Sequence, residues 1–223
     1  TGDIEIDLKL PLRDLSAWRL RGKLATKGAT AGLAGIKQQF TDLTGSARFR
    51  NKRVTATDLS ATLLGQPVKI SVAPIDDERS AFSHRAFVNG RMPLNALRDA
   101  LGMPVFEPIA GDMDLEAQAM FPGGRGEPSP FRLFLRSDLV GFSSQLPEPV
   151  NKLAESSDGL NMELQFPERG TVNVLCSLQR GIAWALQVSD GDDGWKLRRG
   201  TVLRGTEVPP LPAQPGIGVY GAI

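Results

Sequence analysis

The sequence holds one histidine and one cysteine among its 223 residues. A single cysteine, Cys176, excludes an internal disulfide, and its alternating apolar position in TVNVLCSLQ indicates a small buried hydrophobe. A single histidine, His84, excludes a histidine-rich metal site. Proton-transfer catalysis would also need an orienting partner and a nucleophile, and the segment around His84 offers no pattern for either. We therefore expect neither an enzyme nor a metal or other cofactor.

Long apolar runs and an excess of one charge are absent too. No run approaches the roughly 20 apolar residues that cross a bilayer. The 26 basic and 25 acidic residues nearly cancel, and no basic stripe is interleaved with aromatics, so nucleic acid is not an expected partner. The chain starts inside an alternating pattern without initiator methionine or signal peptide, from which we expect a segment of a longer protein.

What the sequence has in abundance is alternation of apolar and polar residues, which in a strand sends successive side chains to opposite faces. Turn-forming sequences separate several of the alternating runs, with PERG at 167–170, QRG at 179–181 and SDGDDG at 189–194. Strands joined by such short turns are antiparallel neighbours. The alternating runs cover residues 3–10, 112–119, 160–166, 172–178 and 182–188. They predict a mainly β fold of antiparallel strands, each with one apolar face.

Three further segments have structural interpretations. PLNALRDALG at 93–102 spaces its leucines for a helix, opens with proline and closes with glycine, which predicts one short helix. Asp190, Asp192 and Asp193 lack the spacing and the terminal glutamate of a calcium loop, so we expect a hairpin turn there. FPGGRGEPSPF at 121–131 is followed by no helix that could offer its N-terminus to a phosphate, so we expect a flexible hairpin loop.

The apolar strand faces permit two architectures. Two sheets could pack these faces together as the core of a closed β-sandwich. Alternatively, one long twisted sheet could curl and leave a concave apolar face open, as a groove that acyl chains could occupy. The alternation by itself does not separate the two.

Several passages, taken in their order along the chain, resemble the YhdP family, large AsmA-like envelope proteins of Gram-negative bacteria. In RSDLVGFSSQLPEPVNKLAES at 136–156, a strand end of the form Ser-Asp-Leu-x-Gly precedes a Leu-Pro-x-Pro turn that ends at Lys152. FTDLTGSARFRNKRVTATDLSATLLGQPVKISV at 40–72 is similar to the family's loop, hairpin and following strand. GRMPLNALRDALGMPVFEPIAGDMDLEAQAMFP at 90–122 resembles its short helix and glycine-initiated strand. Leu153 stands where the family often has proline, which affects only the local shape of the turn.

The resemblance implies a long, twisted and curled sheet of antiparallel strands, an open β-groove, over residues 1–223 as one segment, with any subdivision near 141–158. It implies a periplasmic segment of an inner-membrane-anchored envelope protein, whose groove carries phospholipids between the inner and outer membranes. The implied partners are phospholipid acyl chains, the rest of the same polypeptide, and the inner membrane through a transmembrane segment outside this chain. The alternative is a closed β-sandwich that serves as a structural or interaction module of the envelope without ligand.

A groove would hold acyl chains by non-directional burial at about 25 cal/mol per Å², so sets of residues rather than single contacts are predicted to matter. Pro147 and Pro149 cannot donate ladder hydrogen bonds, so residues 143–152 should leave the sheet. This stretch is expected to cover a groove rim or cap a sheet edge, or else to form an ordinary surface loop. The predicted groove-lining residues are Met113, Leu115, Leu133, Leu135, Met162, Leu164, Val172, Val174, Ile182, Trp184 and Leu186.

Overall fold

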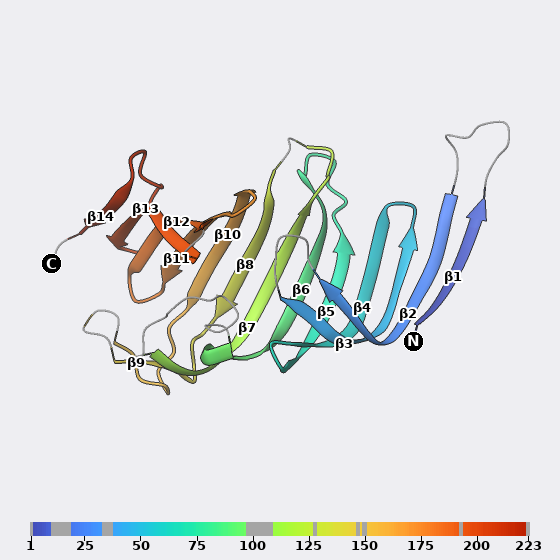
Figure 1. Cartoon of the computed structure of the whole chain (residues 1–223), viewed down its shortest axis with the longest axis horizontal. Coiled ribbons are helices and arrows are strands. Elements are labelled where there is room, and N and C mark those ends of the chain that lie inside the picture. The colour runs from blue at the N-terminus through green and yellow to red at the C-terminus, as the bar shows by residue number, and fades with distance from the viewer. Residues whose placement is uncertain are drawn as a thin grey trace. The chain divides into compact units, whose positions relative to one another are not determined.

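A computed structural model describes residues 2–9, 19–32, 38–96, 109–126, 129–145, 148, 151–191 and 194–221 of the chain. The fold is mainly β, with one long, mostly antiparallel open sheet of 14 strands (Figure 1). Apart from β9, each strand is hydrogen-bonded to the strands that precede and follow it in the chain, so that β8 is followed by β10 in the sheet. β9 pairs with β7. The strands are β1 (Gly2–Lys9), β2 (Arg19–Gly32), β3 (Gln39–Arg50), β4 (Arg53–Leu63), β5 (Gln66–Pro74), β6 (Phe82–Pro93), β7 (Ile109–Pro122), β8 (Phe131–Ser137), β9 (Phe142–Ser144), β10 (Leu160–Glu168), β11 (Thr171–Leu178), β12 (Ile182–Gly191), β13 (Gly194–Arg204) and β14 (Gly216–Tyr220).

The predicted hairpins between β10 and β13 are confirmed. β10 pairs antiparallel with β11 on either side of the PERG turn, and β11 pairs with β12 on either side of QRG. β12 and β13 remain paired up to Gly191 and Gly194, so the two strands form a hairpin, and Ser189 and Asp190 of the acidic segment belong to β12. Asp192 and Asp193 themselves lie outside the described residues. Alternating strands joined by short glycine-containing turns fold as a meander because each strand pairs most readily with the next one.

The structure corrects one expectation and rules out one alternative. β14 is parallel to β13, although consecutive strands were expected to be antiparallel. A parallel neighbour requires a crossover, and residues 205–215 with their prolines provide it. The closed β-sandwich is also wrong. Ile4 and Ile6, on the apolar face of β1, are 66% and 59% exposed, whereas the core of a sandwich would bury them.

The described part of the predicted short helix is small. Residues 94–96 directly after β6 are helical, and the remainder of 93–102 lies outside the described residues. In the described ranges, no helix is long and apolar enough to cross a membrane.

The chain divides into two compact units. Unit 1 comprises residues 1–89 and 120–129, and unit 2 comprises residues 90–119 and 130–223. Unit 1 therefore holds β1 to β5 and most of β6, and unit 2 holds β8 to β14 and most of β7. The expectation of a subdivision near 141–158 stays a prediction.

Candidate functional site

The apolar face of unit 2 follows from its strand register. Directly paired residues of neighbouring strands point to the same side of a sheet, so a row of paired residues lies on one face. Two such rows cross six strands, from β8 through β10, β11, β12 and β13 to β14. The first row contains Leu135, Met162, Cys176, Trp184, Val202 and Val219, and the second contains Leu133, Leu164, Val174, Leu186, Gly200 and Ile217.

Among the residues that the structure describes, this apolar face is open rather than sealed. The large side chains of β10 to β12 in the two rows are half-buried. On β14, Val219 is 76% and Ile217 is 58% exposed. Cys176, a small residue between Met162 and Trp184, is fully buried. Because half-buried side chains retain contact with water, a ligand that covers them would gain about 25 cal/mol for each Å² of apolar area that it buries.

Gly200 affects the packing of this face because it has no side chain. A Cβ atom at Gly200 would lie 2.4 Å from the Cδ2 atom of Leu186, its partner on β12. The absence of a side chain therefore makes room for Leu186 in the row.

The opposite face of unit 2 carries a ladder of polar side chains. Donor–acceptor distances along the ladder lie between 2.9 and 3.4 Å, and the salt bridge between Arg132 and Glu163 opens it. At its end, Nη1 of Arg199 donates to the carbonyl oxygen of Pro212 at 2.9 Å. A register slip of one residue would move these groups to the apolar face, so the ladder helps to fix which face is apolar. Its members in order are Arg132, Glu163, Gln165, Asn173, Gln187 and Arg199.

The crossover between β13 and β14 runs over the polar face. The Arg199 bond to Pro212 ties the crossover to the sheet. Pro209 is buried, and a hollow of about 540 Å³ lies between the crossover residues Val208 and Pro210 and the sheet residues Phe134 and Leu175. The few apolar side chains of this face are thus partly covered by the chain itself, in contrast to those of the apolar face.

Unit 1 has an apolar face of its own. Ile4 pairs with Leu24, and Ile6 pairs with Gly22, which in turn pairs with Phe49. A Cβ atom at Gly22 would lie 2.2 Å from Cζ of Phe49, so the phenylalanine ring lies over the glycine. Ile4, Ile6 and Leu24 are all exposed. These residues were not among the predicted lining residues, although the alternation of β1 had marked its isoleucines as members of an apolar face.

The structure brings most of the predicted lining residues together. Leu133, Leu135, Met162, Leu164, Val174, Trp184 and Leu186 lie in the two rows of unit 2. Val172 is on the same face and pairs with Val188. Ile182 is buried opposite Leu178, and on β7 Met113 is buried while Leu115 is half-buried. Their contact with lipid stays a prediction.

The proline-containing stretch begins with a short strand and a tight approach of two glycines. β9 pairs antiparallel with the first three residues of β7, and Ser144 forms an antiparallel bridge with Lys152. Ser143 and Ser144 therefore keep strand pairing, although residues 143–152 were expected to leave the sheet. The role of the stretch as a groove rim or an edge cap stays a prediction. A Cβ atom at Gly111 would lie 2.0 Å from the carbonyl oxygen of Gly141, so the pairing of β9 with β7 requires glycine. Pro147 and Pro149 lie outside the described residues.

Lys152 anchors the same stretch from inside. Its ammonium group is buried and donates to the carbonyl oxygens of Phe142 at 3.0 Å, Leu153 at 2.9 Å and Ser156 at 2.5 Å. Burial, followed by the positive charge of Arg180, lowers the pKa of Lys152, while nearby carboxylates oppose this shift. The lysine therefore adds three charged hydrogen bonds to the two backbone hydrogen bonds that Lys152 exchanges with Ser144.

A buried ion pair adds to the anchoring of this stretch. The Asp158 carboxylate is buried and pairs with the Arg180 guanidinium, which also donates to the carbonyl oxygen of Asn151. These side-chain contacts add to the backbone hydrogen bonds of the stretch, in which Gly141 donates to Ala154 and Asp158 donates to Asp138.

The single histidine is hydrogen-bonded, and the single cysteine is buried. Nε2 of His84 accepts a hydrogen bond from the backbone N–H of Val54 at 3.0 Å, and Nδ1 lies 3.1 Å from Oγ of Ser83. Burial, and secondarily Arg53, lowers the pKa of His84. Burial raises the pKa of the Cys176 thiol to about 12, so a reactive thiolate is not formed at neutral pH. The described residues contain no cluster of three or more acidic, histidine or cysteine side chains that could hold a metal ion.

Comparison with known proteins identifies a family. The family model described as YhdP protein matches residues 1–223, the whole chain. Searches of curated proteins and of solved structures gave no significant match.

Proposed function

Because this chain belongs to the YhdP family over its full length, we propose that it is a segment of a hydrophobic groove that carries phospholipids across the periplasm. The observation that carries the proposal is the pair of apolar rows that cross six strands of unit 2 and remain open to solvent. The exposed isoleucines of β1 give unit 1 an open apolar face as well.

The physics of such a face suits a cargo that moves. Each methylene of an acyl chain gains about 0.8 kcal/mol on leaving water, in whichever row it lies. Since Leu, Met and Val side chains make no directional bonds, a chain can shift along the face without losing a specific partner. The lipid headgroup stays in water, so the face needs no charged group for it.

The proposal extends to the setting of the segment. We place it in the periplasm, joined to the rest of its polypeptide and held at the inner membrane by a transmembrane segment outside this chain. Transport takes place between the inner and outer membranes and forms no covalent bond with the lipid. The two buried or bonded reactive residues, Cys176 and His84, support a role without catalysis.

The proposal is tested by isolating the 223-residue chain from a Gram-negative host and recording its native mass spectrum, followed by organic extraction. We expect bound phospholipid that is released only on denaturation. A stably folded chain that carries no lipid, and takes none up from detergent-solubilised phospholipid, would contradict the proposal.

A further inference from the structure

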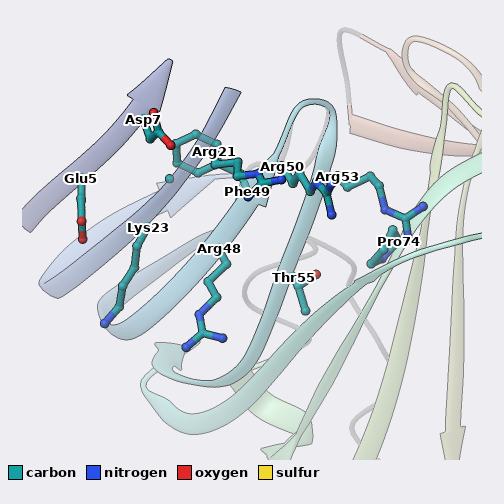
Figure 2. Close-up of a pocket in the computed structure, with 11 residues that line it drawn as sticks. Glu5, Asp7, Arg21, Lys23, Arg48, Phe49, Arg50, Arg53, Thr55 and Pro74 are labelled. Atoms are coloured by element: carbon teal, nitrogen blue, oxygen red, sulfur yellow. The ribbon is translucent and has the colours of Figure 1, made fainter. Parts of the chain in front are cut away.

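Basic side chains gather on the polar face of unit 1. Two rows of paired residues cross β1 to β4 there, Asp7 with Arg21, Arg50 and Arg53, and Glu5 with Lys23, Arg48 and Thr55. Their side chains line a shallow hollow of about 500 Å³ (Figure 2). Figure 2 shows Lys23 of β2 and Arg48 of β3 extended side by side. We call Arg21, Lys23, Arg48, Arg50 and Arg53 the basic surface.

The basic surface is a local excess of positive charge. The chain as a whole carries a net charge of +1, whereas the hollow is lined by these five basic residues and only two acidic ones, Glu5 and Asp7. Arg53 forms a salt bridge with Asp76. Within the described residues, no ion pair joins Arg21, Lys23, Arg48 or Arg50 to a carboxylate.

Like charges also oppose one another across the strands. Arg21 pairs with Arg50, Lys23 pairs with Arg48, and Arg50 pairs with Arg53 at the hairpin end. Directly opposed like charges destabilise a sheet, so the arrangement has a cost that folding alone does not explain. An anionic ligand that binds between the side chains would remove this repulsion.

The geometry of the surface favours many phosphates over one. Neighbouring strands lie about 4.8 Å apart, and side chains on one face repeat about every 6.8 Å along a strand. The five cations therefore form a grid spread over β2, β3 and β4, of which a single free phosphate could contact only a part. Guanidinium groups bind phosphate oxygens in a bidentate manner, and a plane of lipid phosphates could engage the grid as a whole.

We propose that the basic surface of unit 1 binds the phosphate groups of an anionic phospholipid bilayer, and that the polar face of unit 1 thereby docks on a membrane surface. This docking goes beyond the proposed groove, because it uses the face opposite to the exposed Ile4, Ile6 and Leu24.

The test is co-sedimentation of the 223-residue chain with phosphatidylethanolamine vesicles that contain or lack phosphatidylglycerol. Each basic residue near an anionic surface contributes about a factor of five, so the double variant Arg48→Gln/Arg50→Gln should bind the anionic vesicles roughly 30-fold more weakly. Its melting temperature should be unchanged or higher, since like-charge repulsion is relieved. The matched control Lys69→Gln/Arg79→Gln removes two exposed charges of unit 1 outside the hollow and should bind as the unaltered chain does.

Equal binding by the double variant and the unaltered chain would overturn the proposal, as would an equal loss in the matched control. Tight binding of pyrophosphate without binding of anionic vesicles would overturn the membrane as the source of phosphate. A Leu164→Asp variant separates the two proposals, because it should lose groove lipid while retaining its phosphatidylglycerol-dependent binding.

Discussion

Replacing Leu164 by aspartate puts a carboxylate into the middle of the second apolar row of unit 2. Leu164 lies between Leu133 on β8 and Val174 on β11, and these three strands span about 10 Å. For an acyl chain that lies across this row, about three or four of its methylenes would lose their apolar contact with the row near the carboxylate. At about 0.8 kcal/mol for each methylene, the loss is about 3 kcal/mol, or roughly 100-fold in lipid affinity.

The protein itself should remain folded in this variant. Leu164 is half-buried, so its aspartate replacement keeps contact with water and loses only part of the roughly 2 kcal/mol that full burial of a leucine contributes. In a sealed core the unpaired carboxylate would add several kcal/mol, which is comparable to the whole stability of many domains. Urea unfolding measures the change in stability, and native mass spectrometry of bound lipid measures the change in lipid affinity.

The matched control is Asn161→Asp on the same strand. Asn161 is exposed on the opposite face, where it pairs with Arg136 and Ser177. It adds the same charge and should retain both stability and lipid. Unfolding of Leu164→Asp, or a folded Leu164→Asp with the lipid occupancy of the control, would refute the reasoning.

Three further outcomes follow from single residues. Replacing Lys152 by methionine removes the charged hydrogen bonds to three carbonyl oxygens and should lower the free energy of unfolding by roughly 2 kcal/mol, with new protease cleavage within 141–158; unchanged values in both assays would show that the lysine does not anchor the stretch. The lowered pKa of His84 means that the unfolded chain, with a histidine pKa near 6.5, binds the proton more readily than the folded one. The contribution of His84 to the free energy of unfolding should therefore be complete above pH 6.5 and be lost as the pH falls through the lower folded pKa, where protonation also breaks the hydrogen bond from Val54. In His84→Gln this decline should vanish from the urea-unfolding pH profile. A decline that persists in the variant would show that other groups cause it. Cys176, buried and with its pKa raised to about 12, should resist iodoacetamide until urea unfolds the chain, and fast labelling of the native protein by intact mass would contradict that burial.

The strands were predictable because each carries a local signal. In β10, β11 and β12 a large apolar residue or cysteine stands at every second position of one face, and the turns between the strands contain glycine and polar residues, so period and boundaries agree. The predicted lining set includes the members of the two apolar rows that come from β8, β10, β11 and β12, except Cys176, but none of those from β13 and β14.

What alternation leaves undetermined is everything that depends on a second layer or on a distant strand. An apolar strand face looks the same in sequence whether another sheet covers it or water does, so the exposure of Ile4 and Ile6 had no sequence signal. The parallel pairing of β14 depends on the path of residues 205–215 over the polar face, which the register of β13 alone does not specify.

The charge distribution was hidden in a similar way. The basic surface has no contiguous motif, because Lys23 and Arg48 lie 25 positions apart and become neighbours only when β2 pairs with β3. A chain whose basic and acidic residues nearly cancel can therefore still present a concentrated positive face. The sequence shows nearly balanced charges and no continuous basic stripe, and neither observation gives information on clusters that form when strands pair.

The most direct measurement of the central claim is site-specific photo-crosslinking in a Gram-negative host, with a photoreactive amino acid placed at position 164 or at position 161 of the chain. These positions lie on one strand and on opposite faces, so they share expression level and surroundings. Phospholipid adducts at position 164 and none at position 161 are the result that an open acyl-chain groove predicts. Adducts at both positions alike, or at neither while the protein is folded and expressed, would contradict it.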